Sequence, residues 1–407
     1  MKNKIAVFMS IMLLLSTFQI NFVFAGDNSN VLDSIEDTDV NADKVKSALE
    51  NVEIMQLTID DAIRIAKENS REMWKIDDGL KEIKASRRNA RNQKETVETI
   101  ISKSLTELTI EDEAYMNDYV SALLIKNNYY ITTADTQIKE IEKNREILNI
   151  GIEIETKSLY YQVLAAEKTL EINEGNLNKA KEQLRVINLK FNNGTATKAD
   201  VLNGEMAVQK AQTELDSSKD DLEMAKLNLL NKLELPFDMN VILSDKNLEY
   251  VPTSEIDLND TIEKAKTDRP EILAAYNKLE LQKIETHAYT AYYTSGLRQH
   301  KSAVEKLKDA ELNVPQVYKN VELDVRKSYL NLVKAERAIL NMDKTVEIAK
   351  EAARINKLLY DNGMATALDV LEADTSLAQA EISRYQLLVT YNINKMMFDN
   401  CSLVESK

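Results

Sequence analysis

Two short segments of the sequence place a glycine, a threonine and a carboxylate at the same spacing. Residues 192–202 read NNGTATKADVL, and residues 361–371 read DNGMATALDVL. If several copies of the chain brought Asp200, Asp369 and the nearby Glu372 together, these carboxylates would attract cations and deter anions. Crowded carboxylates would also raise some of one another's pKa values. The simpler reading is that each aspartate caps the start of a helix, where negative charge is favourable.

Residue types that serve catalysis or bind metals are sparse. The two histidines, His287 and His300, are 13 residues apart and have no partners at the spacing of a zinc site or a general base. The single cysteine, Cys401, lacks the local pattern of a catalytic thiol and falls in the predicted tail, residues 401–407. The sequence contains neither a glycine-rich phosphate loop nor a nucleophile elbow. We therefore expect no enzymatic activity, no cofactor and no bound metal.

The elements that position these residues are predicted by composition. Of 407 residues only 8 are glycine and 4 are proline, while 29% are charged. Average usage would make glycine alone about 7%, and β-rich folds need many turns built from Gly, Pro and Asn. The fold is therefore predicted to be all-α or nearly so.

The first 25 residues have the pattern of a secretory signal. Lys2 and Lys4 precede an apolar run that ends in a possible cleavage site at residues 23–25; an uncleaved anchor is the alternative. Removing both lysines takes the net charge from −15 to −17, which argues against nucleic acid and anionic membrane surfaces as partners. Residues 26–55 follow as an acidic, flexible lead-in. With one cysteine, no internal disulfide is possible, so packing must stabilise the fold.

The rest of the chain contains two copies of one unit. Tyr160 aligns with Tyr329 and Asp200 with Asp369, without a gap and at one offset of 169 residues. The beginnings of the copies match at an offset of 199, so the first copy carries about 30 extra residues. We expect a first repeat over 56–237, a linker over 238–256 and a second repeat over 257–400.

Within each copy, apolar residues recur every seven positions. In the first copy the large seam residues are Val163, Leu170, Leu177, Leu184 and Phe191. In the second copy they are Leu332, Ile339, Val346, Ala353 and Tyr360. Such heptads predict two long antiparallel helices wound as a coiled coil in each repeat. The first long helix is predicted to begin near Glu140, and the last helix is less regular, because Arg384 takes a position where an apolar residue is expected.

The Asn-Gly segments are the predicted turns of these hairpins. Gly194 and Gly363 each follow a heptad run, where a left-handed residue commonly ends a helix. Thr197 and Thr366 are each followed three residues later by an aspartate, which is the spacing of a capping box that starts the next helix. Each hairpin therefore has a tight, defined turn in a chain that otherwise avoids glycine.

Residues 159–236 resemble the TolC-type outer membrane efflux protein family. Residues 325–398 resemble it again, as does the opening LTIDDAIRIAKENSREM at 57–73. The motifs that carry the resemblance are Y-x-x-x-x-A-x-E in the outgoing helix and F/Y-x-N-G-x-A-T-x-x-D-V-L at the turn.

The resemblance implies an architecture and a set of partners. Such proteins are homotrimers in which each protomer gives two helical hairpins to an α-barrel conduit and adds two β-hairpins. They lie in the outer membrane and periplasm and work with a periplasmic adaptor and an inner-membrane pump or ABC transporter. This chain would then be the outer component of a tripartite efflux pump or type I secretion system.

The resemblance also implies roles for residues at the turns. Asp369 and Glu372 would line a constriction that gates the entrance, and Tyr360 and Asp200 match positions that hold the closed entrance together. The tips that dock the adaptor would be formed by six residues: Asn193, Gly194, Thr195, Asn362, Gly363 and Met364.

The family's β-hairpins are the one part that the sequence does not reproduce. They should lie between Glu72 and Tyr160 and between Glu271 and Tyr329, yet residues 80–150 contain no Gly and no Pro. The best strand candidate, residues 119–133, also fits a helix face, and the second candidate, residues 288–296, is short. We therefore expect these hairpins to be short or absent. A non-conducting coiled-coil scaffold of the cell envelope is the alternative function.

Overall fold

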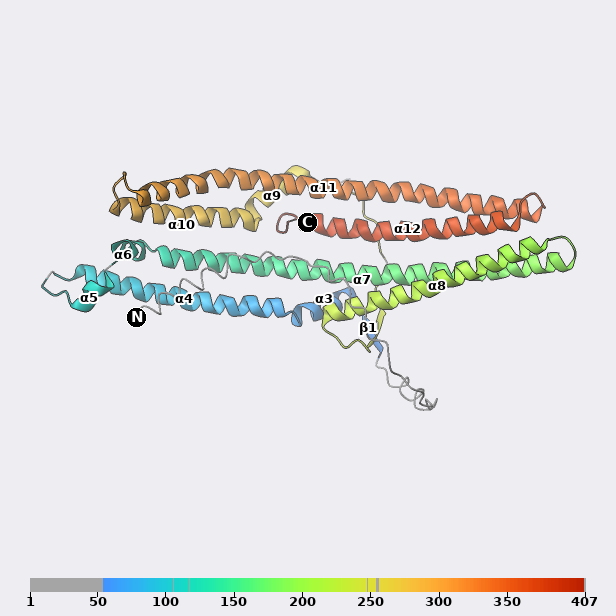
Figure 1. Ribbon diagram of the computed structural model, residues 1–407, viewed down its shortest axis with the longest axis horizontal. Helices are drawn as coiled ribbons and strands as arrows, with labels where there is room; N and C mark the ends of the chain where they lie inside the picture. The colour runs from blue at the N-terminus through green and yellow to red at the C-terminus, as the bar shows by residue number, and fades with distance from the viewer. Residues whose placement is uncertain (1–53, 105, 117, 247, 254–255, 406–407) are drawn as a thin grey trace, which may run out of the picture. The chain divides into compact units, whose positions relative to one another are not determined.

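The computed structural model describes residues 54–104, 106–116, 118–246, 248–253 and 256–405 (Figure 1). All of them lie in the compact unit Glu53–Lys407. The predicted secretory signal, and the predicted acidic lead-in apart from its last two residues, lie outside the described residues.

Long helices dominate the described chain. The first repeat contains α3 (Ile59–Glu68), α4 (Arg71–Ser102), α5 (Ile110–Tyr115), α6 (Tyr119–Lys126), α7 (Tyr129–Asn192) and α8 (Lys198–Leu233). The second contains α9 (Leu258–Asp268), α10 (Pro270–Tyr292), α11 (Arg298–Asp361) and α12 (Ala367–Asp399). Helices α7 and α11 have 64 residues each, which corresponds to roughly 96 Å at 1.5 Å per residue. The predicted nearly all-α fold of two tandem helical hairpins is confirmed.

The segments weighed as strands are mostly helical. Residues 119–133 form α6 and the start of α7, and residues 288–292 end α10. The reason is tertiary packing: Val120 and Leu124, four residues apart on one face of α6, are buried against Ala288 of α10. Helix α7 consequently begins at Tyr129 rather than near Glu140.

The strands of the described chain are two short ones that pair in parallel. β1 (Ile54–Leu57) lies beside β2 (Asn240–Leu243) with Ile54 opposite Asn240. The hydroxyl of Tyr160 on α7 donates a hydrogen bond to the Leu57 carbonyl oxygen (3.0 Å) and accepts one from the Asp245 amide (3.1 Å). The tyrosine thus joins the small sheet to the first hairpin.

In the second repeat, a glutamate on the long helix holds the linker. Glu336 of α11 accepts hydrogen bonds from the Tyr250 hydroxyl (2.8 Å) and the Thr253 amide (3.0 Å). Tyr391 of α12 donates to the Val251 carbonyl oxygen. Desolvation opposes ionisation of Glu336, but the bonds from Thr253 and Tyr250 outweigh it and lower the pKa of the glutamate.

The helices lie side by side in two successive four-helix rows (Figure 1). Toward the Asn-Gly turns the order across the row is α8, α7, α12, α11. Toward the other end the order is α4, α7, α10, α11. Helices α7 and α11 run through both rows. Within the part of the chain that the structure describes, no helix combines the length and apolar character needed to cross a lipid bilayer.

Candidate functional site

The turn between α7 and α8 ends one helix with a Schellman motif. Gly194 has φ +73°, the left-handed region that glycine occupies without a Cβ clash. Its amide donates to the Phe191 carbonyl oxygen (2.9 Å), and the Thr195 amide donates to the Lys190 carbonyl oxygen (2.8 Å). These bonds satisfy carbonyl groups that the end of a helix would leave free.

The turn between α11 and α12 repeats this geometry. Gly363 also has φ +73°, and its amide donates to the Tyr360 carbonyl oxygen (3.0 Å). The Met364 amide donates to the Leu359 carbonyl oxygen (2.8 Å). The two turns are therefore the same structure built twice.

Each following helix starts with a capping box. Asp200 accepts a hydrogen bond from the Thr197 amide (2.7 Å), while the Thr197 hydroxyl oxygen accepts one from the Asp200 amide (3.2 Å). Thr366 and Asp369 repeat the pair at 2.7 and 3.3 Å. The backbone amide of each threonine, followed by its hydroxyl, lowers the pKa of the aspartate that it contacts.

The two turns lie together at one end of the molecule (Figure 1). Ile187 and Val201 of the first hairpin share an apolar cluster with Tyr360, Ala367 and Val370 of the second. The structure therefore brings Tyr360 of one hairpin beside Val201, the residue that follows Asp200 in the other.

The remaining predicted site residues project from these turns. Asp369 and Glu372 are exposed, and no described side chain bonds to the Glu372 carboxylate. The six predicted docking residues are all exposed as well: Asn193, Gly194, Thr195, Asn362, Gly363 and Met364. One copy of the chain thus presents its turns and carboxylates to solvent.

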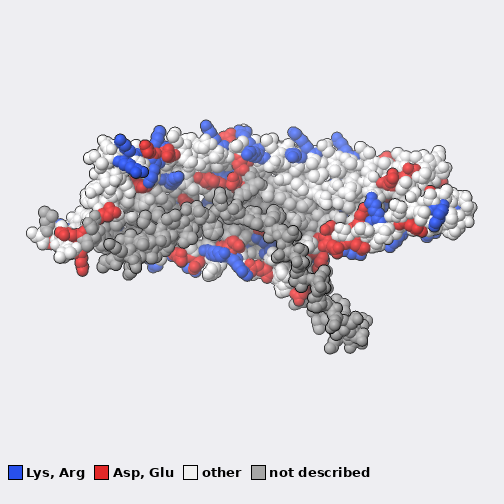
Figure 2. Space-filling model, viewed as in Figure 1, with Lys and Arg blue, Asp and Glu red and all other residues white. Residues whose placement is uncertain are grey.

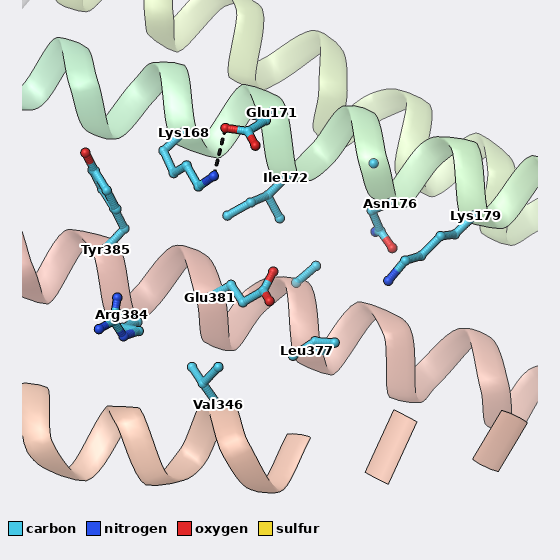
Figure 3. Close-up of a pocket in the computed structure, with 12 residues that line it drawn as sticks. Lys168, Glu171, Ile172, Asn176, Lys179, Val346, Leu377, Glu381, Arg384 and Tyr385 are labelled. Atoms are coloured by element: carbon cyan, nitrogen blue, oxygen red, sulfur yellow. Dashed lines mark hydrogen bonds and ion pairs between the residues drawn. The ribbon is translucent and has the colours of Figure 1, made fainter. Parts of the chain in front are cut away.

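A groove between α7 and α12 was not foreseen from the sequence (Figure 3). It has a volume of about 520 Å³ and carries charges of both signs, including Lys168, Glu171, Lys179, Glu381 and Arg384. Lys168 and Glu171 pair across one helical turn at 2.8 Å. The one feature of the sequence that pointed to this groove is Arg384, which interrupts the apolar heptad pattern. Its guanidinium pairs with Asp343 of α11.

The histidines and the cysteine take structural positions. His300 Nδ1 lies 3.0 Å from the Tyr293 carbonyl oxygen across the turn from α10 to α11, and His287 is exposed on α10. Cys401 is fully buried, and burial raises the pKa of its thiol to about 11. Among the described residues, no three His, Cys, Asp or Glu side chains gather as a metal site.

A comparison with known families addresses the resemblance seen in the sequence. Residues 288–394 match the family model described as outer membrane efflux protein. This chain resembles that family, as the sequence predicted. No curated protein sequence matches it.

Solved structures share the fold at low identity. A membrane protein from Pseudomonas aeruginosa matches with a TM-score of 0.65 at 14% identity, over 85% of this chain and 93% of that one. The outer membrane protein VceC from Vibrio cholerae matches at 0.61 and 13%, over 86% and 97%. The open state of the MtrE outer membrane channel from Neisseria gonorrhoeae matches at 0.59 and 14%, over 85% and 88%. These likenesses establish a TolC-like fold for the protomer.

Proposed function

We propose that this protein is the outer conduit of an export system. It assembles as a homotrimer in the cell envelope and receives substrate from an adaptor and an inner-membrane pump. The system is a tripartite efflux pump or a type I secretion system. The match to the outer membrane efflux family and the TolC-like fold support this proposal. The observation that carries it is a pair of apolar edges that one copy leaves uncovered.

The first apolar edge runs along α11. Six large apolar residues on this helix are between 44% and 70% exposed: Leu323, Leu330, Leu340, Ile348, Ile355 and Leu358. They lie outside the helix face that carries the buried seam residues Leu332 and Ile339. In a helix of 3.6 residues per turn, such positions form one continuous stripe. Exposed apolar stripes of this length mark surfaces that bind another protein.

The second apolar edge lies on α8, at the other side of the same row. Leu202, Met206 and Met224 are 48%, 70% and 60% exposed. Because α8, α7, α12 and α11 lie in that order, the two stripes cannot meet within one chain. They can meet between neighbouring copies, and a heterologous contact of this kind generates a ring when its rotation closes.

The heights of the two stripes agree with such a ring. Three contacts fix the register across the row: Asn173 Nδ2 to the Glu214 carbonyl oxygen (3.3 Å), Lys179 Nζ to Asp374 Oδ1 (3.0 Å) and the Arg384–Asp343 pair. Counting along the antiparallel helices from these contacts places Met206 level with Ile355, and Met224 level with Leu340, within one helical turn. A rotation about an axis parallel to the helices keeps those heights and brings the apolar residues together.

The turns are the proposed docking and gating end of the conduit. In a ring, all Asn-Gly turns lie at the same end, where an adaptor can contact them. Asp369 and Glu372 of several copies then surround one entrance and favour cations over anions. Tyr360, packed between the two hairpins, holds the entrance closed, and opening separates the hairpins at this cluster.

Assembly can be tested by substituting one residue on each apolar edge. We expect Met206→Asp combined with Ile355→Asp to yield monomers by light scattering, while the wild-type chain forms trimers. Phe237→Asp is the matched control, because Phe237 is 60% exposed but lies on neither edge. A wild-type chain that remains monomeric at all concentrations would contradict the proposal.

Conduction can be tested in planar bilayers and in reconstituted adaptor complexes. We expect a conductance that prefers cations, and we expect Asp369→Asn with Glu372→Gln to weaken that preference several-fold. Glu205→Gln, which removes an exposed carboxylate from α8, should leave it unchanged. Stable rings that neither conduct nor bind an adaptor through the turns would favour the non-conducting scaffold instead.

A further inference from the structure

The row of helices farther from the Asn-Gly turns has edges of a different kind. Here α4 and α11 are the outer helices. Both expose charged residues of both signs in this row, together with a few apolar ones such as Val304 and Leu312 of α11. Charges of both signs are visible along α11 in Figure 2. We propose that α4 of one copy binds α11 of the next copy through a seam of opposite charges. This inference rests on the proposed ring and assigns the contact that closes it at this end.

The cationic part of the seam lies in the middle of α4. Arg88 and Arg91 are exposed on the side of α4 away from the buried Ala90 and Val97. Neither guanidinium has an ion pair or hydrogen bond to any described residue. Both guanidinium groups are therefore available to carboxylates of a partner.

The acidic counterpart lies on α11. Glu305 and Asp309 are exposed on the face away from the buried Ala303 and Ala310. No described residue pairs with either carboxylate. The nearby Lys306 and Lys308 are engaged within the chain, with Glu285 (3.6 Å) and Glu311 (3.7 Å) respectively.

The register of the four helices sets the height of each charge. It is fixed by Arg145 Nε with Asp77 Oδ1 (2.8 Å), Asn277 Nδ2 with Glu140 Oε1 (2.8 Å) and Lys306 Nζ with Glu285 Oε1 (3.6 Å). Each pair of neighbouring helices is antiparallel, so residue numbers rise along one helix as they fall along the next. Counting across from these contacts places Arg91 level with Glu305 and Arg88 level with Asp309, within one turn.

The match extends to the next turn, where both signs reverse. Glu95 and Glu98 follow the arginines on α4, and Lys301 and Arg298 take the corresponding heights on α11. From Arg88 to Glu98, α4 carries two positive and then two negative charges. At the same heights, from Asp309 back to Arg298, α11 carries two negative and then two positive charges. A surface built to bind a uniformly anionic polymer or membrane would not alternate in this way. A second copy of the same chain presents a charge of opposite sign at each of the four heights.

The charges of α4 cannot reach those of α11 inside one copy, although Glu98 already pairs with Lys94 within α4 (3.5 Å). Helices α7 and α10 lie between α4 and α11, and at roughly 8–10 Å between neighbouring axes the two edges are more than 20 Å apart. That exceeds the Debye length of about 10 Å at 0.1 M salt. A rotation about an axis parallel to the helices, by contrast, brings α4 of one copy beside α11 of the next at unchanged height.

Charge reversal on one edge tests the seam in the full-length protein. We expect Arg88→Glu with Arg91→Glu to raise the dissociation constant for assembly roughly tenfold or more at 50 mM salt, because repulsion replaces attraction. The effect should shrink at 0.5 M salt. Sedimentation velocity or native mass spectrometry gives the association state, and circular dichroism checks that the helices remain folded.

Compensation on the facing edge makes the test specific. Adding Glu305→Lys and Asp309→Lys to the α4 variant should restore assembly to within a few fold of wild type. The matched control is Lys278→Glu with Lys283→Glu, which makes the same charge change with exposed residues of α10 at nearly the same height. This control should assemble like wild type.

The outcomes separate this inference from the proposed function. Wild-type rings that tolerate the α4 reversal, or that are not restored by the α11 change, overturn the charged seam while leaving the conduit intact. A wild-type chain that never assembles overturns both. Equal losses in the α4 variant and the α10 control would also contradict the seam, because the effect would then follow net charge alone.

Discussion

Lys190 of α7 places its Nζ 3.6 Å from the centroid of the Tyr360 ring on α11. This cation–π contact joins the two hairpins directly beside their turns. The ring belongs to the apolar cluster that contains Ile187 and Val201. The Tyr360 hydroxyl, however, is buried and has no hydrogen-bond partner among the described residues. The ring therefore holds the hairpins together, and the hydroxyl opposes that packing.

Replacing Tyr360 with phenylalanine should stabilise the protein. The change keeps the ring and its contact with Lys190 but removes a buried hydroxyl whose desolvation costs about 1 kcal/mol or more. We expect the free energy of unfolding, measured by urea titration and circular dichroism, to rise by about 1 kcal/mol. Tyr160→Phe is the control: its hydroxyl has two hydrogen bonds to the small sheet, so its loss should destabilise by about 1 kcal/mol. A fall in both variants would contradict the assignment.

The turn glycines should not tolerate a side chain. Gly194 and Gly363 both have φ +73°, and nothing lies within 4 Å of a Cβ at either position. The cost of alanine therefore comes from the backbone conformation alone, at roughly 1–2 kcal/mol for each turn. Urea titration of Gly194→Ala and Gly363→Ala checks this expectation.

The internal control for this measurement has the opposite sign. Gly151 lies inside α7 and also has open space around a Cβ. Gly151→Ala should therefore stabilise by about 0.5–1 kcal/mol, because alanine favours the helix. If all three alanine variants shifted stability in the same direction, the positive φ at the turns would not be the cause.

The capping boxes should make stability depend on acid pH. The pKa of Asp200 and of Asp369 is lowered in the folded state, chiefly by the amide of the capping threonine. The contribution of each cap is therefore fully present above the ordinary aspartate pKa of 3.8 and is lost as the pH falls through the folded-state pKa. We expect wild type to exceed Asp200→Asn/Asp369→Asn in stability at pH 6, and the difference to vanish toward pH 2.

A second pair of aspartates controls for charge. Asp220 and Asp361 are exposed and form no capping box. Their substitution by asparagine removes the same net charge, so it should leave the pH dependence of unfolding close to that of wild type. Hydrogen exchange at the start of α8 and α12 would locate the loss. A uniform effect along both helices would argue against the caps.

The turns and seams were predictable because their causes are local. A glycine after a heptad run and a threonine three residues before an aspartate specify a helix end and a helix start without any partner segment. Arg384 was visible as an exception to the heptads, but only the fold shows that it forms an ion pair with Asp343 of α11. The sequence could not give the groove between α7 and α12, since that depends on how the two hairpins pack.

The start of α7 and the conformation of residues 119–133 depended on tertiary contacts. Tyr119 to Leu124 carries β-favouring residues, yet α6 is helical because Val120 and Leu124 pack on Ala288 of α10. Intrinsic propensity is a weak guide when burial decides the outcome. The outer helices of each row could not be predicted from the sequence either, because the relative heights of their residues depend on which helices are neighbours.

A buried arginine near the start of α10 was also invisible in the sequence. Arg269 is 1% exposed and pairs with Asp324 of α11 and with Glu271 (3.5 Å). The fully buried Cys401 belongs to the core cluster beside it, where Arg269 and Asp324 both act on the thiol. The guanidinium thus neutralises carboxylates in the core where α9, α10, α11 and the end of the chain meet.

Arg269→Met should open this core and expose the thiol. Breaking a buried ion pair by removing one partner costs about 3–5 kcal/mol, so the unfolding transition should move to lower urea. Because burial raises the pKa of Cys401 to about 11, wild type should react with a maleimide at pH 8 only very slowly, and the variant should react faster. Arg354→Met removes an exposed arginine that pairs with Glu351 and should change neither property. Unchanged labelling in Arg269→Met would show that the ion pair does not hold this core closed.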